Sequence, residues 1–111
     1  MNKYGAVKIN AFESTIRWFV GDINDFIKKY KLEEYDLSSD ALGYTVIHKG
    51  RCYVYSNGED VNNTIPHEAV HAISRMTESK GILFSNNNHE MLAYLIGYVS
   101  GKILDKINEC K

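Results

Sequence analysis

Residues 44–56 read YTVIHKGRCYVYS, and this stretch sets the class of fold. Two runs rich in β-branched and aromatic residues, 44–48 and 51–56, flank the dipeptide Lys49-Gly50. Residues of these types favour strands, and a glycine-containing dipeptide between two such runs is typical of a tight turn. The sequence therefore predicts a β-hairpin at this position.

The residues before the hairpin supply further strands and a short helix. Residues 3–9 are expected to be extended, and the alternation within 15–20 favours a second strand. A single helix from 11 to 30 is a competing interpretation of the same region. Asp22 is a good N-cap for a helix over 23–31, whose apolar side chains fall on one face.

Two longer helices are predicted after the hairpin. The first is expected to begin at a cap formed by Asn63 or Thr64, to carry Pro66 in its first turn and to end near Gly81. The second is expected over 89–108. The order strands, short helix, hairpin, helix, helix predicts a small α+β fold.

Length and composition indicate one domain, residues 1–111, with no extreme of charge. The chain is 44% hydrophobic and 24% charged with a net charge of −1, so it has no basic surplus for binding nucleic acid. The N-terminus lacks the apolar run of a secretory signal, and the most apolar stretch, 91–99, is about half the length that spans a bilayer. We therefore expect a cytoplasmic protein that binds neither nucleic acid nor membrane. Cys52 and Cys110 are expected to remain unpaired thiols.

The motif His67-Glu68-x-x-His71 lies within the first of the two long helices. Residues four apart lie on one helix face, so both imidazoles can bind one tetrahedral zinc ion at N–Zn distances of about 2.0–2.1 Å. Glu68 points in a different direction around the helix axis, which lets it reach a water on the open side of the ion. A chance HExxH is expected in only about one in a hundred chains of this composition. The motif therefore predicts a Zn²⁺ site with Glu68 as its general base.

A third zinc ligand has to come from outside the HExxH motif. Glu90 follows His71 after eighteen intervening residues, which leaves room for one helix to end and another to return. His89 is the alternative ligand, and Asn87-x-x-Glu90 also fits a capping box, in which Glu90 would bond only the backbone. A strip of small residues lies on the same side of the last helix as Glu90, namely Ala93, Gly97 and Gly101. Such a strip lets the histidine helix approach closely, which favours Glu90 as the ligand.

These residues resemble the metal site of the gluzincin type of zincin-like zinc metallopeptidase, in which HExxH is followed by a glutamate ligand on a second helix. The matching residues are His67, Glu68, His71 and Glu90. The stretch EMLAYLIGY at 90–98 also resembles very small HExxH proteins encoded by bacteriophages and prophages, whose function is undefined. The resemblance covers residues 44–107. It implies a minimal zincin-like domain, in which a small antiparallel sheet or hairpin packs on the HExxH helix and a C-terminal helix.

The resemblance implies a zinc-dependent hydrolase, an intracellular metalloprotease in which Glu68 assists a zinc-bound water to cleave a peptide bond. Its partner would be a peptide or protein substrate, including a host protein if the chain is encoded by a phage. Tyr94, Tyr98 and His48 are candidates for a second donor to the oxyanion, although Tyr94 stands where some gluzincins place an aspartate. The strand 51–56 is a candidate edge for binding an extended substrate. The alternatives are a zinc-stabilised, non-catalytic binding or inhibitor protein that acts on a host partner, and a hydrolase of non-peptide amides.

Overall fold

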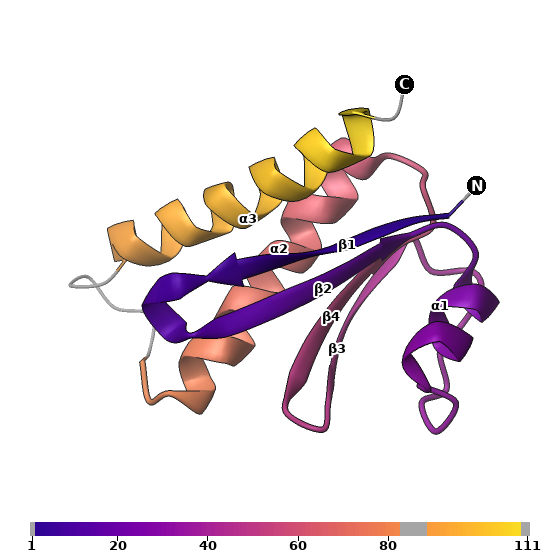
Figure 1. Ribbon diagram of the computed structural model, residues 1–111, viewed down its shortest axis with the longest axis horizontal. Helices are drawn as coiled ribbons and strands as arrows, with labels where there is room; N and C mark the ends of the chain where they lie inside the picture. Colours follow the sequence, from indigo (N-terminus) through magenta and orange to yellow (C-terminus); the bar gives the residue numbers. More distant parts are fainter. Residues whose placement is uncertain (1, 83–88, 110–111) are drawn as a thin grey trace.

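A four-stranded mixed sheet forms the centre of the fold (Figure 1). The structure, a computed structural model, describes residues 2–82 and 89–109. In these residues the strand order is β1-β2-β4-β3, with bounds β1 (Lys3–Ile9), β2 (Ser14–Val20), β3 (Gly43–His48) and β4 (Arg51–Ser56). The other elements are a 3-10 turn, η1 (Asn10–Phe12), and the helices α1 (Ile23–Tyr30), α2 (Val61–Ser79) and α3 (His89–Glu109). The predicted α+β class is confirmed.

The predicted hairpin is confirmed, and its second strand lies inside the sheet. Lys49 and Gly50 both have positive φ, 51° and 76°, as a two-residue type I′ turn requires. β4 pairs antiparallel with β3 and parallel with β2, in a register that begins at Ile16↔Cys52. The expected antiparallel sheet is therefore wrong. The chain crosses from β2 through α1 before it forms the hairpin, and this crossover allows the parallel pairing.

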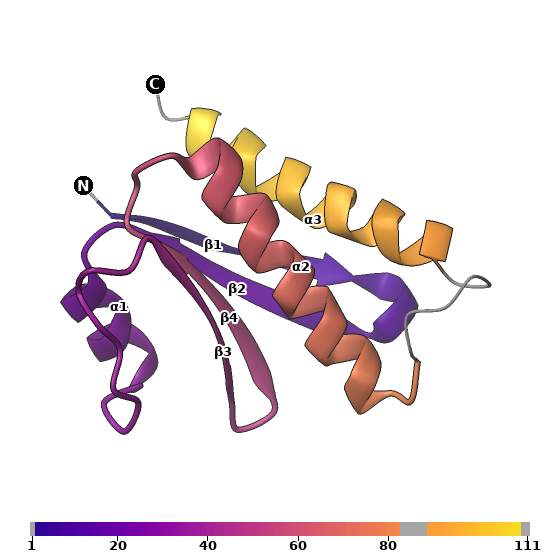
Figure 2. The same ribbon diagram turned by 180° about the vertical axis from the view of Figure 1, so that it is seen from behind.

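Helix α1 covers one face of the sheet, whereas α2 and α3 cover the other (Figure 1, Figure 2). Alternate residues of β2 serve the two faces. Ile16 and Trp18 join the core under α2 and α3, and Phe19 packs against Phe26 of α1 with ring centroids 5.6 Å apart. This burial on both faces explains why the segment forms a strand, so the competing helix from 11 to 30 is wrong.

The predicted cap of α1 is confirmed, whereas that of α2 is wrong. The Asp22 carboxylate accepts a hydrogen bond from the backbone N–H three residues later at 3.0 Å. Helix α2 begins at Val61, before the expected cap at Asn63 or Thr64, and Asp60 precedes it with a left-handed φ of 50°. Thr64 lies inside the helix, where its hydroxyl donates back to the Asp60 carbonyl as threonines inside helices do.

The earlier start of α2 also moves its proline, while its end is as predicted. Pro66 lies in the second turn instead of the first, where its missing N–H removes one main-chain hydrogen bond. The helix ends at Ser79. Gly81 follows with φ of 75°, and the Ile82 N–H donates to the Thr77 carbonyl at 2.8 Å. This Schellman arrangement satisfies the last carbonyls of the helix, which confirms the stop near Gly81.

Large apolar side chains of α3, not its small residues, face the core. Its buried apolar residues recur at helical spacing: Leu92, Leu95, Val99, Ile103 and Ile107. Ala93, Gly97 and Gly101 are exposed, and a Cβ added to either glycine would meet nothing within 4 Å. The predicted approach of α2 along the small strip is therefore wrong, because the larger side chains take the buried face. No helix of residues 2–82 and 89–109 is long and apolar enough to cross a membrane.

Candidate metal centre

The two histidines of the HExxH motif lie side by side on α2. The ring centroids of His67 and His71 are 4.9 Å apart, and the ring planes meet at 75°. Both residues are exposed. An imidazole pair at this spacing can give two nitrogen ligands to one cation. The structure thus brings the two rings together, and metal binding by them remains a prediction.

The Glu68 side chain points towards the sheet and contacts strand β3. This side chain is 7% exposed. The Thr45 hydroxyl on β3 lies 2.7 Å from Glu68 Oε1 and 3.0 Å from the Glu68 carbonyl oxygen, and it can donate to either acceptor. The shorter distance favours the carboxyl oxygen as the acceptor, so Thr45 can hold the carboxyl of the residue proposed as the base. The sequence analysis missed this partner, because a threonine in a strand carries no sign of which helix it will face.

Close packing between β3 and α2 depends on Gly43. A Cβ added there would lie 2.7 Å from the Tyr55 carbonyl oxygen, 2.9 Å from Thr64 Cγ2 and 3.2 Å from Glu68 Cγ. Contacts below 3.0 Å are not tolerated without movement, so only glycine fits this position as built. Gly43 precedes Thr45 by two, so both lie on one face of β3. The spacing of this glycine and threonine could have predicted which face of β3 lies against a neighbouring element.

A surface cavity of about 420 Å³ lies beside Glu68 and His67. Its lining comes from the start of β3, the loop before α2 and the first turns of α2: Leu42, Gly43, Asp60, Asn63, Thr64, His67 and Glu68. The Asp60 carboxylate accepts hydrogen bonds from Asn63 Nδ2 at 3.0 and 3.1 Å. Asp60 is a second carboxylate on this cavity that the sequence analysis did not consider.

The third ligand expected from the sequence does not join the histidine pair in the structure. Glu90 and His89 are exposed in the first turn of α3. Among the described residues, no three His, Cys, Asp or Glu side chains form a group that could hold a metal ion. The residues therefore fit two ligand positions of a cation and leave the third unassigned. Asn87 of the capping-box alternative lies outside the described residues.

The two candidate tyrosines lie on α3, on the side of β1. Tyr94 is 71% exposed and stacks on Tyr98, with ring centroids 6.4 Å apart and planes at 19°. Both tyrosines line a shallow cavity with Lys8 and Asn10 of the first strand and turn. Neither residue lines the cavity that His67 and Glu68 share.

His48 ends β3, at the opposite end of that strand from Gly43. The two positions are five residues apart along the extended strand, a span of roughly 16 Å. His48 Nδ1 lies 3.0 Å from the Tyr35 hydroxyl and 3.2 Å from Glu34 Oε1. The side chain is therefore held by residues of the loop before β3.

The free edge of the sheet next to α2 is β3, not β4. Strand β4 lies between β2 and β3, so its backbone is paired on both sides. The prediction that residues 51–56 offer an edge to an extended substrate is therefore wrong, because the parallel pairing with β2 occupies that side. Within residues 2–82 and 89–109, β3 keeps one unpaired side, and Gly43 and Thr45 hold this strand against α2.

Comparison of the chain with protein-family models, with curated proteins and with solved structures found no match in any of the three. The zincin-like resemblance therefore rests on the motif residues and their spacing alone.

Proposed function

We propose that this protein is a metal-dependent hydrolase of peptide bonds, in which His67 and His71 hold a divalent cation and Glu68 is the general base. The observation that carries the proposal is the position of Glu68. Glu68 is buried and lines the same cavity as the exposed His67. A general base has to be held in one orientation within reach of a water, and a cavity wall beside a metal ligand meets both requirements. Zn²⁺ is the first candidate, because imidazole ligands suit it.

A purely structural role for Glu68 does not explain why this buried position holds a carboxylate. Thr45 donates to one carboxyl oxygen, and no Lys, Arg or His of the described residues forms an ion pair with Glu68. Burial of a carboxylate without a cationic partner is costly. A glutamine could accept the same hydrogen bond from Thr45 without that cost. A cation bound at the neighbouring imidazoles would account for a carboxylate here.

The residues around the cavity would have different roles in hydrolysis. A bound cation would supply polarisation of a substrate carbonyl and acidification of the attacking water. Glu68 would accept the proton of that water and deliver it to the leaving amine. Thr45 holds one carboxyl oxygen, which leaves the other for proton transfer. The unpaired side of β3 would bind an extended peptide by main-chain hydrogen bonds, and this is the reason to prefer a peptide substrate over other amides.

Glu90 remains the proposed third zinc ligand, and Asp60 is the alternative third ligand because it lines the cavity. Hydrolytic zinc sites usually have three protein ligands and one open position. Asp60 lines the cavity beside His67, whereas Glu90 begins another helix. Zinc titration of Glu90→Ala and Asp60→Ala separates the two, because loss of a ligand weakens zinc binding and loss of a bystander does not.

The experiment that tests the function compares Glu68→Gln with Glu78→Gln, an exposed glutamate on the same helix. Zinc per chain is measured on each purified protein, and cleavage is followed as new N-termini in a mixture of unfolded proteins. We expect Glu68→Gln to keep its zinc and to lose at least about a hundredfold in rate, while Glu78→Gln retains the wild-type rate. Cleavage that persists in Glu68→Gln, or a wild-type chain that binds no divalent metal, would refute the proposal. A zinc-bound chain that cleaves nothing would instead favour the non-catalytic binding protein.

A further inference from the structure

The outer edge of β1 is unpaired and runs alongside α3. Within residues 2–82 and 89–109, β1 pairs only with β2, so the main-chain groups on the other side of this seven-residue strand have no neighbouring strand. In both views α3 runs next to β1 in the opposite direction, with its C-terminal end near the start of the strand (Figure 1, Figure 2). The sheet therefore has a second open edge, on the opposite side from β3.

Three surface cavities lie in a row between β1 and α3. Their volumes are about 450, 380 and 260 Å³. The first and second share Ala6 and Lys106 in their linings, and the second and third share Lys8 and Tyr98. The three cavities thus form one continuous groove, the β1–α3 groove, which follows the chain from residue 2 to residue 11.

One flank of α3 faces this groove. Residues four apart lie on the same side of a helix, and four of the α3 residues that line the groove follow that spacing: Tyr94, Tyr98, Lys102 and Lys106. From residue 94 to residue 106 the helix rises about 18 Å, the length of about six residues of extended strand. The flank is therefore long enough to contact alternate side chains of a strand added beside β1.

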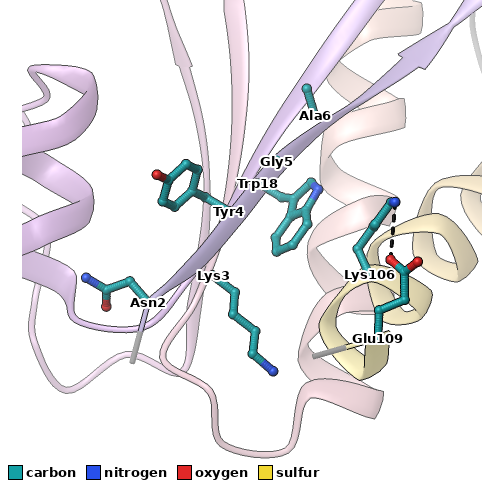
Figure 3. A pocket seen from close by; sticks show the side chains of 8 residues that line it. All are labelled: Asn2, Lys3, Tyr4, Gly5, Ala6, Trp18, Lys106 and Glu109. Atoms are coloured by element: carbon teal, nitrogen blue, oxygen red, sulfur yellow. Dashed lines mark ion pairs between the residues drawn. The ribbon is translucent and has the colours of Figure 1, made fainter. Parts of the chain in front are cut away.

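The side chains of β1 and β2 that meet this flank lie on one face of the sheet. Figure 3 shows Trp18 and Lys3 on the side of β1 that faces α3, and Tyr4 on the other side. Lys3 Nζ donates to the Ile107 carbonyl of α3 at 2.8 Å. Lys29 Nζ of α1 lies 3.9 Å from the centre of the Tyr4 ring. The alternation expected of a strand thus separates the groove from the α1 face.

The groove is cationic towards the end where β1 begins. Lys3, Lys102 and Lys106 line it from the α3 face. Glu109 is the one carboxylate of the described residues in its lining, and it pairs with Lys106 at 3.2 Å. No carboxylate of the described residues pairs with Lys3 or Lys102. The surplus does not depend on Lys8, whose side chain starts on the other face of the sheet, and it favours a negatively charged partner.

The other end of the groove is aromatic. Tyr94 and Tyr98 are 71% and 37% exposed, and their rings stack on one another. Leu95 and Ile9 line the same end. Exposed rings of this kind offer apolar area to a side chain that lies across them. A segment that fits the whole groove therefore carries apolar side chains at one end and acidic side chains at the other.

A second copy of the chain fits this groove less well than an acidic segment. Its β1 would bring Lys3 and Lys8, and no carboxylate, to a groove that is already cationic. The edge of β3 is also less suited to an acidic segment, because Asp60 and Glu68 line the cavity beside it. Lysines at a sheet edge discourage pairing with strands that carry no negative charge. The charge of the groove thus selects among extended partners.

We propose that the β1–α3 groove binds an acidic segment of another protein, which adds to β1 as a fifth strand of the sheet. Main-chain hydrogen bonds to the free edge of β1 hold the segment, and its alternate side chains meet the flank of α3. Apolar side chains lie against Tyr94 and Tyr98, and carboxylates lie against Lys102 and Lys106. This site is separate from the proposed hydrolase, since no residue of the HExxH motif lines the groove.

Trp18 makes the test direct, because it is the one tryptophan of the chain and lines the groove. The full chain is titrated with an eight-residue peptide that has threonine at alternate positions and, between them, two valines followed by two glutamates. This order suits an antiparallel strand, and a peptide of the reverse order suits a parallel one. We expect one of the two to change the tryptophan fluorescence with a dissociation constant below about 1 mM and to slow amide hydrogen exchange in β1. Neither change with either peptide at about 5 mM overturns the proposal.

Modified peptides separate strand addition from simple attraction of charge. In an added strand the N–H groups of alternate residues point towards β1, and the others point to solvent. N-methylation of the first set should weaken binding at least about tenfold, whereas N-methylation of the second set should leave it unchanged. Glutamine in place of both glutamates should also weaken binding about tenfold. Equal affinity of the two N-methylated peptides overturns strand addition.

Variants of the chain place the acidic end of the peptide. Lys102→Gln and Lys106→Gln should each weaken binding about threefold, because exposed charge pairs are individually weak. Salt at about 0.5 M should weaken binding to the wild type as well. Lys28→Gln is the matched control, since it removes an exposed lysine of α1 on the other face of the sheet. The same loss in Lys28→Gln as in Lys102→Gln overturns the site.

Two further measurements keep the result clear. His67→Ala should leave peptide binding intact, which distinguishes failure of this site from failure of the proposed hydrolase. Hydrogen exchange that slows in β3 instead of β1 would place the peptide at the other edge and overturn the proposal. Sedimentation of the free chain should show a monomer. A dimer with slowed exchange in β1 would assign this edge to a second copy and would also overturn it.

Discussion

Replacement of Thr45 by valine isolates the contact that orients the proposed base. Valine has nearly the same shape as threonine and keeps the β-branched side chain that a strand favours. The change therefore removes the hydroxyl and little else. In the native chain that hydroxyl lies 2.7 Å from Glu68 Oε1 and 3.0 Å from the Glu68 carbonyl oxygen. Both acceptors lose this donor in the variant.

The magnitude follows from burial and charge. A hydrogen bond to a charged group contributes about 1.5–3 kcal/mol, and an acceptor left unsatisfied in a buried position loses that amount. Glu68 is 7% exposed, so water replaces the hydroxyl only in part. We expect the free energy of unfolding to fall by about 2 kcal/mol, which lowers the melting temperature by roughly 8 °C for a chain of this length. Cleavage should fall about 10- to 100-fold with zinc retained, as happens when an outer partner of a site is lost.

The assay is a double-mutant cycle in urea unfolding. The four proteins are wild type, Thr45→Val, Glu68→Ala and the double variant, and the coupling free energy between the two sites should be about 1–2 kcal/mol. Thr15→Val is the matched control, because its hydroxyl lies on another strand without a partner among the described residues. A coupling free energy below about 0.3 kcal/mol, or equal destabilisation by Thr15→Val, would show that Thr45 does not hold Glu68.

Four other substitutions test the candidate metal centre and the core of the sheet. Gly43→Ala places a Cβ 2.7 Å from a carbonyl oxygen. The free energy of unfolding should therefore fall by about 1–3 kcal/mol, and the rate of cleavage should also fall. An unaltered melting temperature would contradict the close packing of β3 on α2. Either Glu90→Ala or Asp60→Ala should remove the third zinc ligand, and that variant should bind zinc at least about tenfold more weakly. Unchanged zinc affinity in both variants would mean that the protein supplies only the two imidazoles and that water completes the coordination. Burial raises the pKa of Cys52 from 9.0 to about 12, so the unfolded chain loses its proton first and stability falls as pH rises through this window. Cys52→Ala should reduce that alkaline loss, by up to about 1.4 kcal/mol per pH unit, and unfolding curves near pH 8 and 10 check it.

The features predicted correctly from the sequence are set by neighbours along the chain. The positive φ values of Lys49-Gly50 fix the hairpin within two residues, and Asp22 caps α1 within one turn. The same holds for the imidazoles of His67 and His71, whose proximity needs only one helical turn. For such features, local geometry leaves few alternatives.

The errors concern contacts between distant segments. Nothing in residues 51–56 states that their strand will pair in parallel with β2, yet that pairing removes the expected free edge. The small residues Gly97 and Gly101 were predicted to lie at the contact between α3 and α2. Leu95 and Val99 take the buried face of α3 instead, because they bury more apolar area. The direction of Glu68 also depends on the distant β3, so the motif alone does not reveal it.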